Sequence, residues 1–195
     1  MPKNLKVYVV DNGGQWTHRE WRVLRDLEVA TKIIPNTTTL EELSEQGLDG
    51  LVLSGGAPRV ETEMPKLGNT GEFLNDLNIP ILGICVGFHF MAIHFGGTAG
   101  AASSGEFGKV EITIDDHNDL FNDLPEKFQA WESHNDEVKQ IPSGFAKLAH
   151  SETCQVQAFK HLEKPFYGVQ FHPEVEHTDH GYDIFKNFLK VCEDY

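Results

Sequence analysis

The chain has 195 residues, of which 39% are hydrophobic and 24% charged, and its formal net charge is −14. This length suits a single well-formed core, so we expect residues 1–195 to form one domain. The acidic balance argues against a nucleic-acid partner, because phosphate backbones attract surplus lysine and arginine. The sequence also has no apolar run long enough to span a bilayer, so we expect no membrane partner.

The three cysteines, Cys85, Cys154 and Cys192, are odd in number and widely spaced. This usage argues against a disulfide framework and against a cysteine-rich zinc site. The start of the chain, Met1 to Asn4, leads directly into a β-prone run and leaves no room for a signal peptide. We therefore expect a cytoplasmic protein.

The first half of the chain alternates β-prone runs with amphipathic segments. Strands are predicted at 5–10, 30–34, 50–53 and 80–84, and helices at about 16–27, after Thr39, at about 69–77 and after Cys85. Thr39-Leu40-Glu41-Glu42 has the pattern of a capping box, and the stretch with Pro58 and Pro65 is expected to be a loop. This alternation predicts a parallel sheet covered by helices on both faces, with ligands at the carboxyl ends of the strands.

Beyond Gly96-Gly97 the alternation gives way to short β-prone runs separated by turns. The runs are 107–114, 128–131, 145–150, 156–159 and 166–171. We interpret them as antiparallel additions at one edge of the sheet. A terminal helix is predicted from Tyr182 to Cys192, where apolar residues fall at helical spacing. The predicted fold class is therefore α/β, an open, mostly parallel sheet with an antiparallel edge extension.

The stretch from Pro80 to Ile93 carries the main candidate for chemistry. It is typical of a buried strand that stops at Cys85 and turns at once into a helix, with glycines flanking the turn in Gly83-x-Cys85-x-Gly87. The start of that helix would direct unpaired N–H groups at the sulfur, which favours thiolate over thiol. The motif alone is weak, because Gly-x-Cys-x-Gly arises by chance and buried cysteines are usually inert.

A base for the thiol is predicted at His172-Pro173-Glu174, which follows the β-prone run ending at Phe171. A nucleophilic thiol needs a base to exchange its proton, and the base needs an acceptor that orients its ring. A metal site is the competing interpretation, because His172, Glu174, His177 and His180 fall within nine residues. Pro173 argues against the regular helix on which closely spaced zinc histidines are usually fixed.

Several segments of the chain resemble one family, the class I (triad) glutamine amidotransferases. The segments are Asp11-Asn12-Gly13-Gly14-Gln15, Lys32-Ile33-Ile34-Pro35-Asn36-Thr37-Thr38, Leu53-Ser54-Gly55-Gly56, Gly83-Ile84-Cys85, Trp131-Glu132-Ser133-His134-x-Asp136-Glu137-Val138 and Tyr167-Gly168-Val169-Gln170-Phe171-His172-Pro173-Glu174-Val175-Glu176-His177-Thr178. Their order along most of the chain makes the resemblance specific. The segments around Pro35 and His177 look like the GMP synthase branch, in which the glutaminase is a separate subunit.

The resemblance implies a flavodoxin-like sheet and hydrolysis of glutamine to glutamate and ammonia. Cys85 would be the nucleophile, His172 the general base and acid, and Glu174 the orienting carboxylate. The family stabilises the oxyanion with backbone N–H groups at positions that match Gly56 and Val86. A glycine loop and the residue after an elbow nucleophile suit that role physically.

Ser133 and His134 match the family segment that holds the α-amino and α-carboxylate groups of glutamine. This chain departs from the family pattern at two positions. His89 stands where a substrate-contacting glutamine is common, and Ala57 separates Gly56 from the proline that usually follows it directly. Imidazole can still donate a hydrogen bond to the substrate, but its reach and protonation differ from those of an amide.

The resemblance further implies a partner, a separate ATP pyrophosphatase (synthetase) subunit that uses the ammonia to convert XMP to GMP. ATP and magnesium would bind to that subunit, and no cofactor or metal is implied in this chain. Asp136 and Glu137 follow the substrate-binding pair, so Asp136 is a candidate residue for coupling to the partner. Three alternatives stay open: an amidotransferase that serves a different synthase, a stand-alone γ-glutamyl hydrolase or peptidase, and a catalytically silent regulatory subunit.

Overall fold

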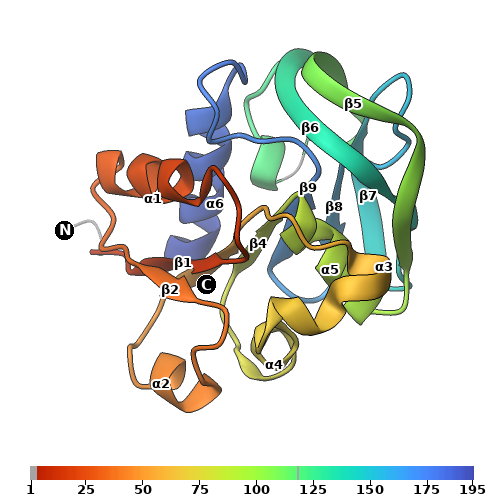
Figure 1. The fold of residues 1–195 in the computed structure, drawn as a ribbon. Helices are drawn as coiled ribbons and strands as arrows, with labels where there is room; N and C mark the ends of the chain where they lie inside the picture. The colour runs from red at the N-terminus through yellow and green to blue at the C-terminus, as the bar shows by residue number, and fades with distance from the viewer. Residues whose placement is uncertain (1–3, 118) are drawn as a thin grey trace.

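The computed structural model of the chain describes residues 4–117 and 119–195 (Figure 1). Met1, Pro2 and Lys3, on which the expectation about a signal peptide rests, lie outside these ranges. The elements in chain order are β1 (Val7–Asp11), α1 (Thr17–Asp26), β2 (Ile33–Pro35), α2 (Leu40–Ser44), β3 (Gly50–Leu53), α3 (Val60–Glu63), the 3-10 helix η1 (Met64–Leu67), α4 (Thr70–Asp76), β4 (Ile81–Ile84), α5 (Val86–His94), β5 (Thr98–Ile114), the 3-10 helix η2 (Asp119–Phe121), β6 (Lys127–Gln140), β7 (Phe145–His150), β8 (Ala158–His161), β9 (Phe166–Val169) and α6 (Gly181–Asp194).

Within the described residues, the strands form one nine-stranded sheet in the order β2-β1-β3-β4-β9-β8-β7-β5-β6. The strands from β2 to β9 in that order run parallel to their neighbours, and the pairs from β9 to β6 are antiparallel. This arrangement confirms the predicted α/β class, with a parallel sheet extended by antiparallel strands at one edge.

Helices cover both faces of the parallel part, as the buried side chains of β1 show. Val7 and Val9 join a core cluster with Leu24 of α1 and Phe185 of α6. Val10, which points to the other face, joins a second cluster that includes residues of α2, α4 and α5. The alternation of side chains along a strand therefore divides the core into two layers. In Figure 1, α1 and α6 lie on one side of the sheet, and α4 and α5 lie on the other.

Two predicted boundaries in the first half hold closely, and one predicted loop contains further structure. The capping box at Thr39 is present: the backbone N–H of Glu42 donates to Thr39 Oγ1, and the backbone N–H of Thr39 donates to Glu42 Oε2. The strand at 50–53 is also confirmed. The predicted loop between Pro58 and Pro65 holds the short helices α3 and η1, which are too short for hydrophobic periodicity to reveal.

The prediction that the run 166–171 belongs to the antiparallel edge is wrong. β9 pairs in parallel with β4, Leu82 opposite Tyr167, and only its other side pairs with the antiparallel β8. A strand's residues do not encode its neighbour, so this run looks like the others in the second half. Because β4 and β9 are parallel, their carboxyl ends lie at the same edge of the sheet, and the residues that follow them can form one site.

The runs 107–114 and 128–131 are parts of much longer strands. β5 and β6 pair over most of their length and curl above the rest of the sheet at the upper right of Figure 1. The inward positions of β6 pass from Phe128 and Ala130 to Glu132 and His134, all four of them buried. Glu132 and His134 are ionisable although they point inward, so the apolar–polar alternation ends there while β6 continues to Gln140. For this reason the sequence predicted a strand that is too short.

The structure also bears on the expectations about disulfide bonds and about membrane-spanning segments. Within the described part of the chain, Cys85, Cys154 and Cys192 are all buried and form no disulfide bond. Among the helices of the described residues, the structure contains none with the length and apolar character needed to cross a membrane.

Candidate active site

Cys85 occupies a sharp turn between β4 and α5. It is the N-cap residue of α5 and has φ 49° and ψ −104°, a conformation that L-residues rarely adopt. The flanking glycines allow this turn, since a Cβ atom on Gly87 would lie 2.4 Å from the carbonyl oxygen of Leu53. Backbone strain of this kind costs about 1–3 kcal/mol and is common at functional sites. The predicted elbow is therefore present, with the side chain at the carboxyl end of the strand.

His172 and Glu174 lie at the same edge of the sheet. His172 comes just after β9, the neighbour of β4, and its Nδ1 atom is 2.7 Å from Glu174 Oε1. The His172 ring also packs edge-on against Trp16, with ring centroids 4.3 Å apart. On the Cys85 side, a Cβ added to Gly55 would lie 3.1 Å from His172 Cε1 and 3.6 Å from Cys85 Cβ. The two catalytic candidates therefore meet over Gly55.

The electrostatics of this group favour a protonated His172 imidazole. Burial lowers the pKa of His172, but the Glu174 carboxylate and the Cys85 sulfur outweigh it and hold that pKa well above its ordinary value. Both side chains of the His172–Glu174 pair are almost completely buried. With Nδ1 engaged by Glu174, the Nε2 atom of His172 is the one available to exchange a proton with Cys85.

The other predicted site residues gather around a cavity of about 200 Å³ next to Cys85, which we call the β6-side cavity. Its lining includes Cys85 and every other predicted oxyanion, substrate-binding or coupling residue: Gly56, Val86, His89, Ser133, His134 and Asp136. Gly56 and Val86 adjoin each other, since a Cβ atom on Gly56 would lie 3.0 Å from Val86 Cγ1. The structure thus brings residues from separate segments of the chain to one place.

His89 lines this cavity, yet its ring is bonded to the protein interior. Its Nε2 atom lies 2.7 Å from Gln170 Oε1, and an amide oxygen can only accept, so Nε2 carries the proton. Burial lowers the pKa of His89 to about 4, which keeps the ring neutral. The Gln170 amide nitrogen is then directed at Cys85 Sγ, at 4.0 Å.

Gln170 is a functional candidate that the sequence reasoning missed, a fully buried amide beside the nucleophile. The signal that could have found it is a polar residue between Val169 and Phe171, in an otherwise apolar run that precedes His172. A buried amide must be hydrogen-bonded on both ends, so its presence there indicates buried polar partners.

His134 is held by two acceptors behind the cavity. Its Nδ1 atom is 2.8 Å from the carbonyl oxygen of Asp136, and its Nε2 atom is 2.9 Å from Glu106 Oε2. Both ring nitrogens are therefore engaged by groups of the protein. Any contact from His134 to a substrate would have to come from its backbone.

The two carboxyl groups near His134 have pKa values that are shifted in opposite directions. Burial raises the pKa of Glu106, but hydrogen bonds donated by His134, Ser151 and Thr153 outweigh it and leave that pKa below its ordinary value. Burial and the nearby Glu106 raise the pKa of Glu132 well above its ordinary value, which favours its protonated form. This buried network supports the segment that ends at His134.

Two groups of side chains bear on metal binding. In the described part of the chain, Glu106, Glu132 and His134 place potential ligand atoms within 4.8 Å of one another, but His134 Nε2 and Glu106 Oε2 are already bonded to each other. The four residues that the sequence suggested as metal ligands, His172, Glu174, His177 and His180, do not share one site, because their side chains contact different residues. His177 packs against Trp131, and His180 Nδ1 is 3.3 Å from Asp183 Oδ2. The structure therefore favours the interpretation of His172 as a base over that of a metal ligand.

Comparison with known proteins agrees with this geometry. The family described as glutamine amidotransferase class-I matches residues 8–192. The chain is 55% identical over 191 residues to a glutamine-hydrolyzing GMP synthase subunit of Thermoplasma acidophilum, covering 98% of this chain and 94% of that protein. It is 49% identical over 187 residues to the subunit of the same name from Methanocaldococcus jannaschii, covering 95% and 97% of the two chains.

Solved structures give the same result. A crystal structure described as a putative GMP synthase subunit from Thermoplasma acidophilum matches with a TM-score of 0.91 and 54% identity, covering 98% of this chain and 95% of that one. A glutamine amidotransferase from Thermotoga maritima, at 21% identity and TM-score 0.73, covers 98% and 83% and shares the fold. The chain belongs to the class-I glutamine amidotransferase family.

Proposed function

We propose that this chain is the glutaminase subunit of a two-subunit GMP synthase. It hydrolyses glutamine to glutamate and ammonia and supplies the ammonia to a separate ATP-dependent synthetase subunit that converts XMP to GMP. The main support for glutamine hydrolysis is that Cys85 lies next to the buried His172–Glu174 pair at one edge of the sheet. The branch of the family is supported by the relatives named as glutamine-hydrolyzing GMP synthase subunits.

In the first half of the reaction, Cys85 attacks the side-chain amide carbon of glutamine. His172, which holds the proton that it has accepted from the Cys85 thiol, delivers this proton to the departing ammonia, while Glu174 holds the imidazole in orientation and stabilises its charge. The C–N bond breaks as the thioester forms. In the second half, His172 removes a proton from water, the water oxygen attacks the thioester, and glutamate leaves as the Cys85 sulfur is released.

The tetrahedral intermediates carry a negative oxygen, which needs donors that are already in place. The backbone N–H groups of Gly56 and Val86 are our candidates, because both residues adjoin Cys85 at the β6-side cavity. Ser133 and His134 would hold the α-amino and α-carboxylate groups of glutamine on the same side. His89 would act by orienting Gln170 toward the sulfur, as its hydrogen bond indicates.

Glutamate release tests this function when it is measured with the chain alone and with an XMP-aminating, ATP-dependent synthetase subunit. We expect glutamine hydrolysis that requires Cys85 and His172, and formation of GMP from XMP only when both subunits are present. Absence of hydrolysis under both conditions would leave a silent regulatory subunit. Full activity of the chain alone, with no response to the synthetase, would favour a stand-alone hydrolase.

A further inference from the structure

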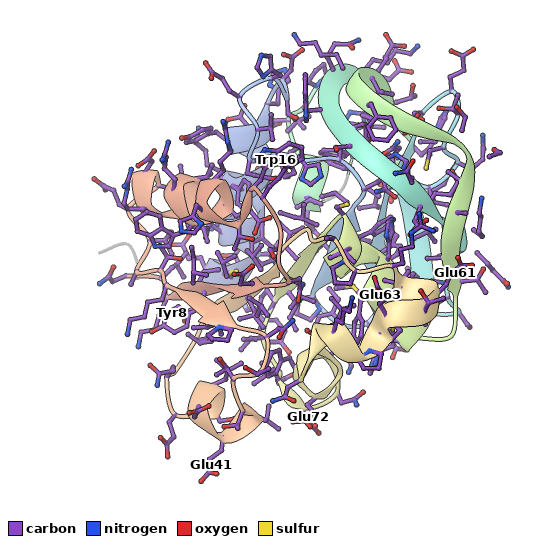
Figure 2. All side chains as sticks on the ribbon, in the orientation of Figure 1. Tyr8, Trp16, Glu41, Glu61, Glu63 and Glu72 are labelled. Atoms are coloured by element: carbon purple, nitrogen blue, oxygen red, sulfur yellow. The ribbon has the colours of Figure 1, made fainter. Side chains whose placement is uncertain are left out.

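Cys85 lies between two cavities. One is the β6-side cavity with the candidate substrate-binding residues. The other, of about 310 Å³, lies beside the loop between β1 and α1, and we call it the α1-side cavity. Its lining includes Cys85, His172, Trp16 and Glu20, and it shares Gly56, Ala57 and Ser133 with the β6-side cavity. Trp16, labelled near the centre of Figure 2, is the residue whose ring packs against His172.

The chemistry of amide cleavage gives the two cavities different roles. In the proposed reaction, the amide oxygen faces the backbone N–H groups of Gly56 and Val86. The carbon chain extends toward His89 and His134, which line the β6-side cavity but not the α1-side cavity. The nitrogen must face His172, because that residue gives it a proton. His172 lines the α1-side cavity, so ammonia is released on that side.

Glu20 is the buried ionisable group of this second cavity that the reaction does not use. The Glu20 side chain is 1% exposed. Its Oε1 atom accepts a hydrogen bond of 3.3 Å from the backbone N–H of Gly55. Its Oε2 atom is buried without a hydrogen-bond partner among the described residues. A buried polar atom of this kind needs a partner, and here the available space is the cavity.

The protonation of Glu20 suits a small basic ligand. Burial and the nearby Glu174 raise the pKa of Glu20 well above its ordinary value, against the opposite effect of His172, and Asp11 adds to the increase. This shift favours the neutral carboxyl, whose O–H can donate a hydrogen bond. A neutral acid can bind the lone pair of ammonia without bringing a net charge into a buried site.

We propose that the α1-side cavity is a chamber for the released ammonia and that the Glu20 carboxyl is its binding group. The inference rests on the proposed glutaminase function. Ammonia leaves His172, enters the cavity and forms a hydrogen bond with Glu20. Whether the shared proton lies on oxygen or on nitrogen, the pair as a whole is neutral, and the ammonia is recovered as a nucleophile when the proton returns to the carboxylate.

Hydroxylamine is a probe for this chamber, because it is a small amine that can intercept the Cys85 thioester. Its nitrogen bonds to the acyl carbon as the C–S bond breaks, and its proton passes through His172 to the sulfur. The product is γ-glutamyl hydroxamate. The ratio of hydroxamate to glutamate reports how well a small amine reaches the thioester, independently of how fast the thioester forms.

We expect Glu20→Gln to lower this ratio about tenfold, the effect of losing about 1.4 kcal/mol of amine binding. The amide oxygen of Gln can still accept the Gly55 N–H, so the loop keeps its support. Ammonium chloride should suppress hydroxamate formation in the wild type, and about ten times more should be needed in Glu20→Gln. Glu72→Gln is the control, a residue on the outer side of α4 in Figure 2, and should keep the wild-type ratio.

Each outcome decides the inference. A wild-type ratio in Glu20→Gln overturns it, as does a raised KM for glutamine with no change in ratio, which would identify the cavity as the glutamine site. A wild type that forms neither glutamate nor hydroxamate overturns the proposed function and the inference together. If Glu20→Gln does not fold, Glu20→Asp, which keeps the acid but withdraws it by one methylene, should give an intermediate ratio, and an unchanged ratio there refutes the proposal.

Discussion

The Nε2 atom of His89 donates to the amide oxygen of Gln170 at 2.7 Å, and this contact decides which end of Gln170 faces the nucleophile. If the amide were reversed, its oxygen would face Cys85 Sγ and repel a thiolate. The neutral Nε2–H form of His89 thus places a donor beside the sulfur. Protonation of His89 would charge a side chain that is 4% exposed and has no carboxylate as its hydrogen-bond partner among the described residues.

Stability should therefore fall in acid because of His89. Its pKa is about 4 in the folded chain against 6.5 in the unfolded one, so between these values the unfolded state binds more protons. The contribution is complete above pH 6.5 and is lost as the pH falls toward 4. From pH 7 to pH 5 the loss should be about 2 kcal/mol.

Urea unfolding of wild type and His89→Gln at pH 7 and pH 5 measures this effect. Gln at this position can donate to Gln170 and does not titrate, so the variant should lose about 2 kcal/mol less than the wild type over this interval. Equal losses in the two proteins would show that His89 is not the titrating group.

Cys85 should be the sole cysteine required for glutamine hydrolysis. Cys85→Ala should fold and be inactive, whereas Cys154→Ala and Cys192→Ala should remain active. Burial raises the pKa of the Cys154 thiol far above the range in which a thiolate forms, and a Cβ atom on Gly50 would lie only 2.6 Å from Cys192 Sγ, which shows how closely this sulfur is packed. Glutamate release and circular dichroism of the three variants make the comparison, and turnover by Cys85→Ala would refute the mechanism.

The backbone at position 85 should store measurable strain. With φ at 49°, residue 85 has a backbone conformation that glycine adopts without steric cost and alanine does not. Relief of strain of about 1–3 kcal/mol, less the greater entropy of unfolded glycine, should make Cys85→Gly about 1 kcal/mol more stable than Cys85→Ala. Thermal or urea unfolding of the two variants decides the sign, and a less stable glycine variant contradicts the prediction.

Glu174 should matter less than His172 for turnover. His172 transfers the proton, so His172→Ala should lower kcat by about 10²–10⁴-fold. Glu174→Gln removes a charge 2.7 Å from the ring but not the proton-transfer group itself, so its loss should be smaller. Steady-state glutamate release from both variants provides the ranking. The opposite order would mean that the roles assigned to these two residues are wrong.

The synthetase subunit, loaded with ATP and XMP, should stimulate glutamine hydrolysis, and Asp136 should contribute to this coupling. Asp136 is partly buried at the β6-side cavity, and its carbonyl oxygen holds the His134 ring. A partner that binds the competent arrangement ten times more tightly supplies about 1.4 kcal/mol. Asp136→Ala should therefore weaken the stimulated rate more than the basal rate.

The coupling experiment measures glutamate release from wild type and Asp136→Ala, alone and with the loaded synthetase. Asp76→Ala, an exposed residue of α4, is the matched control and should respond to the partner like the wild type. An isolated chain that already works at the full rate argues against coupling. Equal proportional losses in the basal and stimulated rates would assign Asp136 to the site itself.

Local patterns in the sequence are enough to predict the elements around the nucleophile. The glycines beside Cys85 indicate a sharp turn, and the structure shows a left-handed φ at Cys85 and a Leu53 carbonyl where a Cβ atom on Gly87 would lie. The capping box at Thr39 and the terminal helix are also predicted correctly, because each depends on residues within a few positions of one another.

The tertiary structure alone determines how distant segments meet. The parallel pairing of β9 with β4 brings His172 to Cys85, yet the residues of β9 do not specify that neighbour. Gln170 lies 85 positions from Cys85, and Glu20 lies 35 from Gly55. The roles of these buried polar groups come from partners that are close in space and remote in sequence, and periodicity and spacing describe only what lies within a few residues.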